Sequence, residues 1–243
     1  MNNNKIIISM TSYPDRIKFV SKVWLSILDN NLNKDLYHCV LVLSEIEFPN
    51  KEKDLPQDLL QLLGSNIEII WVKTNTRSHK KLIPTLQKYP ENAILVIDDD
   101  QLRTKNWLNN FLENHKKYPN DVLAGMCHYR LVNNKFIRCS LKPDIYKNAR
   151  PANGRGGTLY PPHTFNDETF FDEKLYMTLS PTSDECWQFY FLQKYNIPIR
   201  LIQYESDKHL VIKEAQKTAL YRTDNDFGEK YNLIWKNITN FFV

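Results

Sequence analysis

The stretch Ala93-Ile94-Leu95-Val96-Ile97-Asp98-Asp99-Asp100 is the most informative part of the chain, because an unbroken apolar run ends abruptly at three carboxylates. Apolar residues in succession, without polar alternation, are typical of a strand that is covered on both faces, as in the middle of a parallel sheet. Side chains alternate along extended backbone, so Asp98 and Asp100 are expected to point one way and Asp99 the other.

Two carboxylates on one side of a strand repel each other unless a cation lies between them. Mg²⁺ and Mn²⁺ favour such oxygen ligands, and ligands of open α/β sheets bind beyond the carboxyl ends of the strands. The run therefore predicts a metal site that serves a phosphate-bearing substrate. A turn or a helix N-cap is the alternative for a single Asp, and three in succession favour the metal.

The first hundred residues read as strands that alternate with helices. Apolar runs predict strands over residues 6–10, 39–43, 67–72 and 93–97. Helical spacing of apolar residues predicts helices over residues 16–29, 55–63 and 80–89. This alternation predicts a parallel sheet with helices on its faces, in which the polar loop after the first strand and the three aspartates open at the same edge.

The second half of the chain has weaker periodicity, above all over residues 142–182, which are rich in Pro, Gly, Tyr and Phe. The expected elements are helices over 107–115, 184–195 and 229–241, strands over 122–126 and 199–202, and a hairpin around Asn133-Asn134. No linker or repeat separates a second module. We therefore expect a single α/β domain over residues 1–243, with a mostly parallel central sheet and flanking helices.

Composition limits the function classes. The 243 residues carry a net charge of +4, which is too small to argue for nucleic acid but suits an anionic substrate or membrane surface. The four cysteines have no CxxC spacing and fit free thiols in a reducing compartment. With no signal peptide and no apolar run of membrane-spanning length, we expect a cytoplasmic protein, and peripheral contact with the inner face of the cytoplasmic membrane stays open.

Three of the six glycines lie close together, at Gly154, Gly156 and Gly157. Backbone N–H groups of such a loop can hold phosphate or sugar hydroxyls, and the alternative is a plain flexible loop. Neither a Walker sequence nor GxGxxG after the first strand is present, which disfavours dinucleotide binding.

Ser183-Asp184-Glu185 precedes an expected helix. Acidic residues are favoured there by the helix dipole, so simple capping is one interpretation. The other is a general base, a carboxylate that takes a proton from an acceptor hydroxyl.

The six histidines form neither HxH nor HExxH. His163, beside the glycine loop, and His209, after the last strand, are each candidates for a third metal ligand. Arg16, Lys80 and Lys81 are candidate partners for an anion.

Taken in order, Thr-Ser-Tyr-Pro-x-Arg after the first strand, the DxD-type triplet, the Gly-rich Tyr-Pro-Pro segment and Ser-Asp-Glu-x-Trp resemble bacterial GT-A fold glycosyltransferases of polysaccharide or lipooligosaccharide biosynthesis. The resemblance implies a nucleotide-binding half over 1–100 and an acceptor-binding half over 101–243. It implies nucleotide binding by residues of the first loop and of the later strand end: Thr11, Ser12, Tyr13, Arg16, Asp98 and Asp99. Lys81 is added to the nucleotide-binding residues on its position alone.

The resemblance also implies the reaction. A sugar would pass from a nucleotide-sugar donor, a UDP-sugar, to a hydroxyl of a saccharide or lipid-linked acceptor. Mn²⁺ or Mg²⁺ would be held by Asp98 and Asp100. His209 is the third ligand that we assign from its position after the last strand, with His163, or no histidine at all, as the alternatives. Asp184 and Glu185 are the implied catalytic pair, with Asp184 as the base of an inverting mechanism. Because the motif is Ser-Asp-Glu and not the commoner Glu-Asp, retention stays open.

Sugar or acceptor binding is assigned to Gly156, Gly157, Tyr160 and Trp187. The aromatic residues between 146 and 176 could stack on sugar rings, or they could form a small hydrophobic core. Two other functions compete with sugar transfer. One is a metal-dependent phosphotransferase or phosphatase that uses the Asp98–Asp100 cluster, and the other is a non-catalytic carbohydrate-binding protein.

Overall fold

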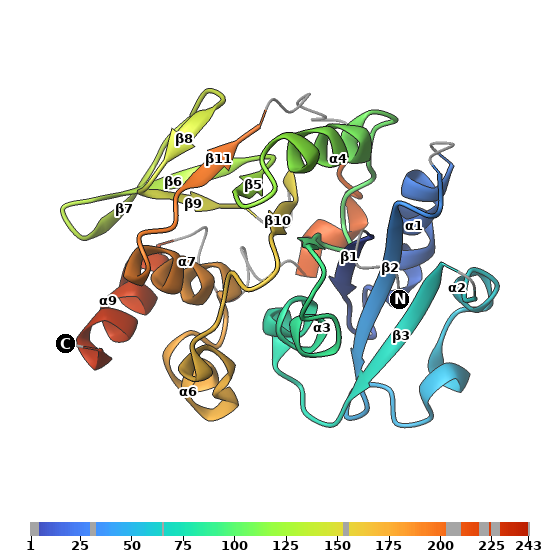
Figure 1. The fold of residues 1–243 in the computed structure, drawn as a ribbon. Coiled ribbons are helices and arrows are strands. Elements are labelled where there is room, and N and C mark those ends of the chain that lie inside the picture. Colours follow the sequence, from blue (N-terminus) through green and yellow to red (C-terminus); the bar gives the residue numbers. More distant parts are fainter. Residues whose placement is uncertain are drawn as a thin grey trace.

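The computed structural model describes residues 5–29, 33–64, 66–152, 156–202, 210–218, 224 and 229–242. Within these residues the strands form an eight-stranded sheet of order β3-β2-β1-β4-β10-β5-β11-β8 (Figure 1). Its strands are β1 Ile6–Thr11, β2 Tyr37–Ser44, β3 Ile67–Val72, β4 Ile94–Val96, β5 Val122–Ala124, β8 Asp144–Tyr146, β10 Thr158–Tyr160 and β11 Ile199–Leu201.

The half of the sheet built by the first hundred residues is parallel, as predicted. β1 pairs with both β2 and β4 in parallel, and Ile8 lies opposite Cys39 on one side and Leu95 on the other. β2 continues the parallel order to β3. The carboxyl ends of β1 and β4 are therefore neighbours, which brings the loop after β1 to the aspartates after β4 (Figure 1).

β10 interrupts this parallel order. It lies between β4 and β5 and runs antiparallel to both, with Thr158 opposite Val96 and Ala124. The weak periodicity of this part of the sequence gave no indication of a strand. Beyond β10, β11 pairs with β5 in parallel, and β8 closes the edge in antiparallel pairing with β11.

The helices cover both faces of the sheet (Figure 1). The α-helices are α1 Val20–Leu28, α2 Gln57–Leu60, α3 Ile83–Lys88, α4 Trp107–Lys117, α6 Glu173–Leu179, α7 Asp184–Lys194 and α9 Tyr231–Phe241. Short 3₁₀ helices are η1 Ile17–Phe19, η2 Lys51–Asp54, η3 Arg77–Lys81, η4 Glu168–Phe171 and η5 Glu214–Thr218. The helix predicted over 80–89 is thus divided between η3 and α3, because Pro84 lies at the start of α3, where its missing N–H costs nothing.

The apolar run of β4 is buried on both faces, as its sequence predicted. Ile94 and Val96 pack into a core under α3, α7 and α9. Leu95 packs into a second core under α1 and α4. None of the three side chains has measurable exposure, so β4 is a central strand of a two-sided core.

The predicted hairpin at Asn133-Asn134 is present and belongs to a second, three-stranded sheet of order β7-β6-β9. Its strands are β6 Cys127–Val132, β7 Lys135–Arg138 and β9 Ala149–Pro151. Asn133 and Asn134 have φ of 48° and 59°, the left-handed values that favour Asn in two-residue hairpin turns.

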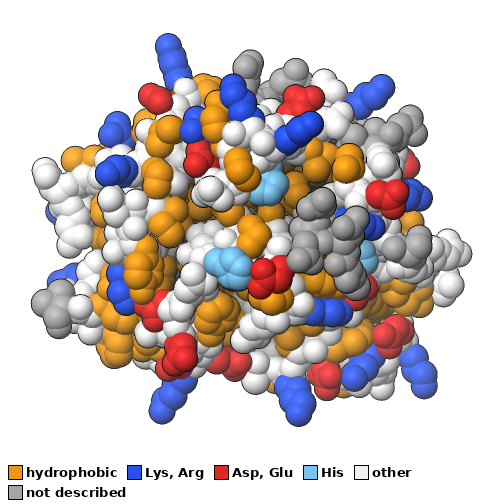
Figure 2. Space-filling model, in the orientation of Figure 1, with side chains coloured by type: hydrophobic (Ala, Val, Ile, Leu, Met, Phe, Trp, Pro, Cys, Tyr) orange, Lys and Arg blue, Asp and Glu red, His pale blue; other side chains and the backbone are white. Residues whose placement is uncertain are grey.

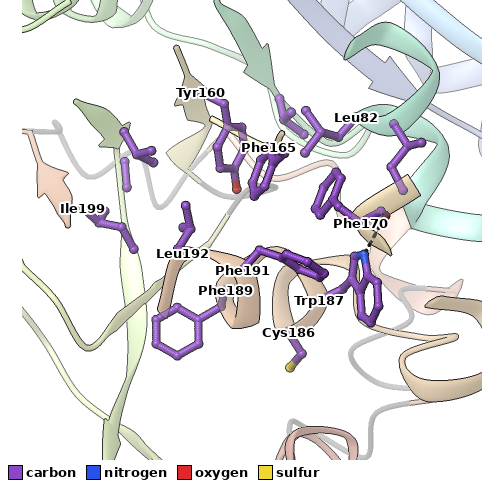
Figure 3. Packing of buried hydrophobic residues seen from close by; sticks show 14 of the residues in the cluster. Leu82, Tyr160, Phe165, Phe170, Cys186, Trp187, Phe189, Phe191, Leu192 and Ile199 are labelled. Atoms are coloured by element: carbon purple, nitrogen blue, oxygen red, sulfur yellow. Dashed lines mark hydrogen bonds between the residues drawn. The ribbon is translucent and has the colours of Figure 1, made fainter. Parts of the chain in front are cut away.

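The aromatic residues of the middle segment form core and not a sugar-binding surface. The rings of Phe165 and Phe170 stack with centroids 4.0 Å apart, and the indole of Trp187 donates to the Phe170 carbonyl at 3.0 Å (Figure 3). Tyr160 and Trp187 have no exposed surface, and the Tyr160 hydroxyl donates to Gln188. Tyr160 and Trp187, which we assigned to sugar or acceptor binding, lie within the core, and neither ring reaches a surface in this structure.

On the face drawn in Figure 2, basic and acidic side chains are interspersed around the rim, in keeping with the small net charge. Among the described residues, every helix falls short of the length and apolarity that a bilayer crossing requires.

Candidate active site

The three aspartates meet the loop after β1. Asp99 is buried and accepts a 2.5 Å hydrogen bond from the Ser12 hydroxyl. Nη2 of Arg16 lies 2.6 Å from Oδ1 of Asp99 and 2.8 Å from Oδ2 of Asp100. The structure therefore brings Ser12 and Arg16 to the carboxylates, the juxtaposition that the strand order predicted.

Charge and burial oppose each other in this group. Burial raises the pKa of Asp99 to about 7, although the Arg16 guanidinium acts to lower it. Burial alone would lower the pKa of Arg16, but the charges of Asp99 and Asp100 raise it. Asp99 and Asp100 lie in a turn after β4 and both reach Nη2 of Arg16, so the expectation that Asp99 points opposite to Asp100, as on an extended strand, is wrong. Asp99 is buried and fixes the β1 loop, whereas the side chains of Asp98 and Asp100 are partly exposed.

Lys81 joins the aspartates to the acidic pair at the start of α7. Its ammonium is buried and lies 2.7 Å from Oδ1 of Asp98 and 3.2 Å from Oδ2 of Asp184. Burial alone would lower the pKa of Lys81, but the charges of Asp184 and Asp98 raise it. The same ammonium lowers the pKa of Asp98 against the effect of desolvation. The Lys81 ammonium therefore lies between the carboxyl groups of Asp98 and Asp184 and is shared by them.

The acidic pair opens α7, as predicted. Ser183 is the N-cap, and its hydroxyl accepts from the Cys186 amide at 3.3 Å. Asp184 is buried and also accepts from the Gln188 amide at 3.3 Å. Capping is thus provided by Ser183, which leaves the carboxylates of Asp184 and Glu185 to serve another purpose.

Arg150 holds Glu185 in place. This buried arginine forms an ion pair with Glu185, and its guanidinium lies 4.3 Å from the ring centroid of Tyr231 and 4.9 Å from that of Tyr129. Burial raises the pKa of Glu185, which Arg150 acts to lower. No motif in the sequence predicted a role for Arg150, which lies on β9 and joins that strand to α7 through Glu185.

A C-terminal segment also reaches the aspartates. The amide of Ile212 donates to the Asp100 carbonyl at 2.9 Å, and the Gln216 side chain donates to Oδ2 of Asp100 at 2.7 Å. The Leu102 amide donates to the carbonyl of Leu210 at 2.9 Å. His209, the expected third metal ligand, lies outside the described residues and directly precedes this segment.

His163, the other candidate ligand, lies at the opposite edge of the sheet. Because β10 runs antiparallel to β4, Tyr160 lies opposite Ile94, at the amino end of β4. His163 continues in that direction and contacts the exposed Glu91 at 3.1 Å. The expectation that His163 could complete the metal site is therefore wrong.

The glycine pair supports close packing of backbone and does not offer a sugar site. A Cβ on Gly156 would lie 2.4 Å from the amide nitrogen of Met126, and Gly157 has a φ of 81°. The Gly156 amide donates to Ala152, and the Gly156 carbonyl accepts from Trp107 at 2.8 Å. The expected sugar-binding role of Gly156 and Gly157 is wrong, because both are buried; Gly154 lies outside the described residues.

The other expected nucleotide-binding residues line the same loop. Thr11 turns toward β2 and donates to the Val42 carbonyl at 2.7 Å, so its side chain supports the sheet. The half-buried ring of Tyr13 lies 6.0 Å from the Arg16 guanidinium. Tyr13 is therefore the residue of this loop whose ring is placed beside the aspartates and partly open to solvent.

The donor set suits a hard divalent cation. Asp98 and Asp100 offer carboxylate oxygens, and Mg²⁺ is commonly held by one or two carboxylates together with substrate phosphates. One oxygen of Asp98 contacts the Lys81 ammonium, and one oxygen of Asp100 contacts the Arg16 guanidinium. A bound metal ion would therefore share these two carboxylates with two positively charged side chains. Within the described part of the chain, no group of three or more His, Cys, Asp or Glu residues is arranged to hold a metal ion.

The parallel sheet, with carboxylates at the end of a central strand, is the GT-A fold of nucleotide-sugar glycosyltransferases. No family model matches the sequence, and no curated protein matches it. Among solved structures, S. aureus TarS 1–349 superposes with a TM-score of 0.53 at 19% identity, over 85% of this chain and 59% of that chain.

Complexes of the same TarS fragment also match. The complex with UDP has a TM-score of 0.52 at 18% identity, and the complex with UDP-GlcNAc has one of 0.51 at 16% identity. Each match covers 85% of this chain. This chain spans less than three-fifths of the length of the TarS fragment, and the likeness defines its fold.

Proposed function

We propose that this protein is a glycosyltransferase that moves a sugar from a UDP-sugar to a hydroxyl of a saccharide or a lipid-linked acceptor. The main support is the meeting of the β1 loop with Asp99 and Asp100 at the carboxyl ends of β1 and β4, where open α/β sheets bind their ligands. The UDP and UDP-GlcNAc complexes of TarS, which shares the fold, favour a uridine nucleotide.

Asp98 and Asp100 are the residues that would hold Mn²⁺ or Mg²⁺. When bound, such a cation supplies neutralisation of the negative charge on a departing nucleoside diphosphate. On the donor side of the site, the side chains of the protein itself supply charge and hold the two aspartates in position. Arg16 fixes Asp100, Lys81 fixes Asp98, and Tyr13 presents an aromatic ring beside them for the nucleotide base.

Asp184 is the proposed base. It shares the Lys81 ammonium with Asp98, so its carboxylate lies close to the donor side of the site. An acceptor hydroxyl held there would lose its proton to Asp184 as the hydroxyl oxygen attacks the anomeric carbon. Glu185 is the second candidate, and its ion pair with Arg150 makes it the more constrained of the two. A lipid-linked acceptor would bring the protein to the surface of a membrane.

The test is release of nucleoside diphosphate from a panel of nucleotide sugars with Mn²⁺, for the unaltered protein and for Asp100→Asn. Asp144→Asn is the matched control, because Asp144 is an exposed aspartate on β8. We expect UDP release to fall about a hundredfold or more in Asp100→Asn and to be unchanged in Asp144→Asn. Comparison of Asp184→Asn with Glu185→Gln identifies the base, since the base variant loses transfer and keeps UDP binding.

Two results would contradict the proposal. Release of inorganic phosphate from a phosphomonoester, without turnover of any nucleotide sugar, would indicate a phosphatase. Binding of a sugar without turnover of either substrate would indicate a carbohydrate-binding protein.

A further inference from the structure

We infer that Lys81 is a positioning residue, whose buried ammonium holds the candidate base Asp184 at a fixed place relative to Asp98, and that it does not itself bind the nucleotide. The inference rests on the proposed function and adds a role that the sequence did not indicate, because Lys81 was expected to be a nucleotide ligand.

Lys81 and Asp184 both lie deeper at this edge of the sheet than Asp98, and the oxygens that the Lys81 ammonium contacts belong to these two protein side chains. The side chains of Lys81 and Asp184 are 4% and 5% exposed, whereas that of Asp98 is 37% exposed. A nucleotide diphosphate that approaches this edge of the sheet therefore meets Asp98 first. The ammonium lies behind Asp98, between the two carboxylates, at 2.7 Å and 3.2 Å from their oxygens.

The element that carries Lys81 is itself anchored next to α7. His79, two residues earlier in η3, shares a 2.8 Å hydrogen bond with the carbonyl of Ser180, close before the start of α7. The His79 ring also stacks on Tyr176 of α6, with centroids 4.5 Å apart. Two residues of η3 therefore contact the region at the start of α7: His79 through a hydrogen bond to Ser180, and Lys81 through its ion pair with Asp184. Lys81 also contacts Asp98 after β4.

The energetic reason for this arrangement is the cost of buried charge. A carboxylate as deeply buried as Asp184 is strongly destabilised without a partner, and removal of one member of a buried pair costs several kcal/mol. Lys81 therefore holds the carboxyl group of Asp184 in place. An error of about 1 Å in the position of a reacting group can reduce a rate about a hundredfold.

The neighbouring lysine offers a matched control. Lys80 is 2% exposed, and its ammonium forms an ion pair with Glu47 and a 2.8 Å hydrogen bond with Asn75, away from the aspartates. Lys80→Met and Lys81→Met therefore each remove one buried lysine ion pair from the same 3₁₀ helix. They differ in whether the partner belongs to the candidate site.

The experiment measures kcat and the donor KM for sugar transfer, the dissociation constant for UDP by calorimetry, and thermal unfolding of each variant. For Lys81→Met we expect kcat to fall about a hundredfold, while the dissociation constant for UDP changes less than about threefold. Lys80→Met should keep kcat. The double variant Lys81→Met/Asp184→Asn should be no slower than Asp184→Asn alone, because Lys81 acts through Asp184.

Lys81→Arg preserves the charge and serves if Lys81→Met does not fold. Its kcat should fall by a smaller factor, with UDP binding unchanged. The inference is overturned if either Lys81 variant binds UDP at least tenfold more weakly with kcat preserved, or if the two losses multiply in the double variant. If the unaltered protein neither binds UDP nor turns over a nucleotide sugar, the proposed function fails; if it does both and only the variants disagree, the role of Lys81 alone fails.

Discussion

Arg16 lies 2.6 Å from Asp99, with neither side chain more than a tenth exposed, and so connects the loop after β1 to the end of β4. The two residues are far apart in the sequence, and the pair exists only because β1 and β4 are adjacent in the sheet. The same guanidinium reaches Asp100 at 2.8 Å, so one arginine organises two of the three carboxylates.

Replacement of Arg16 by Met should therefore destabilise the fold as well as the site. It leaves Asp99 and Asp100 close together without their shared cation, and loss of one partner of a buried pair costs about 3 kcal/mol or more. Urea unfolding measures the change. Lys51→Met is the control, because the Lys51–Glu45 pair is largely exposed and is worth at most about 1 kcal/mol. Equal losses in the two variants would contradict a structural role for the Arg16 pair.

His79 predicts a pH dependence of stability. Burial lowers the pKa of His79 below its ordinary value, although Asp184 and the Ser180 carbonyl act to raise it. The folded state therefore binds fewer protons than the unfolded state as the pH falls below about 6.5. The contribution of neutral His79 is present above that pH and is lost as the pH falls toward the lower folded pKa.

Urea unfolding at pH 7.5 and at pH 5.5 should show that acidification removes a stabilising contribution from the unaltered protein that His79→Gln lacks. Other groups titrate in both proteins: His38 and His115 have lowered pKa values, and Asp99, whose pKa is raised to about 7, acts in the opposite direction as the pH falls. The difference between the two slopes is therefore the contribution of His79. Identical slopes for the two proteins would mean that His79 does not titrate in this range.

The ion pair between Arg150 and Glu185 should show strong coupling. Arg150→Met leaves Glu185 buried beside Asp184 without its cation, and about 3 kcal/mol of stability should be lost. The double variant Arg150→Met/Glu185→Gln removes the orphaned charge and should recover much of that loss. Chemical denaturation of the single and double variants gives the coupling energy, and additive losses would contradict the contact.

Gly156→Ala distinguishes packing from binding. The new Cβ would lie 2.4 Å from the Met126 amide nitrogen and 2.7 Å from the Gly125 carbonyl carbon, both backbone atoms that cannot move freely. Overpacking of this kind costs about 1–3 kcal/mol, so the melting temperature should fall. A variant with unchanged melting temperature and a raised acceptor KM would instead restore the sugar-binding role expected from the sequence.

Local signals in the sequence were enough for several elements. The apolar run at β4 predicted a strand covered on both faces, and Ser183 predicted the start of α7, because each depends on residues within a few positions. The Asn133-Asn134 turn is another local signal, since Asn tolerates positive φ. The strand order then placed Ser12 and Arg16 beside the aspartates.

Long-range contacts could not be predicted in this way. Gln216 reaches Asp100 across 116 positions, and the partner of Glu185 is Arg150, which belongs to no motif. Aromatic residues were ambiguous for another reason. The same rings can stack on sugars or on one another, and only the packing of Tyr160 and Trp187 into the core decided between the two.

The position of β10 also limits how such a protein can be divided. A fragment that stops at Asp100 would lack the strand that covers the outer edge of β4, and an open edge on a fully apolar strand invites pairing with other chains. If recombination replaced all residues after 100 together, the new segment would have to supply a strand that pairs with β4 in place of β10. Gradual substitution within a shared sheet is therefore the easier route by which the second half of this architecture could change.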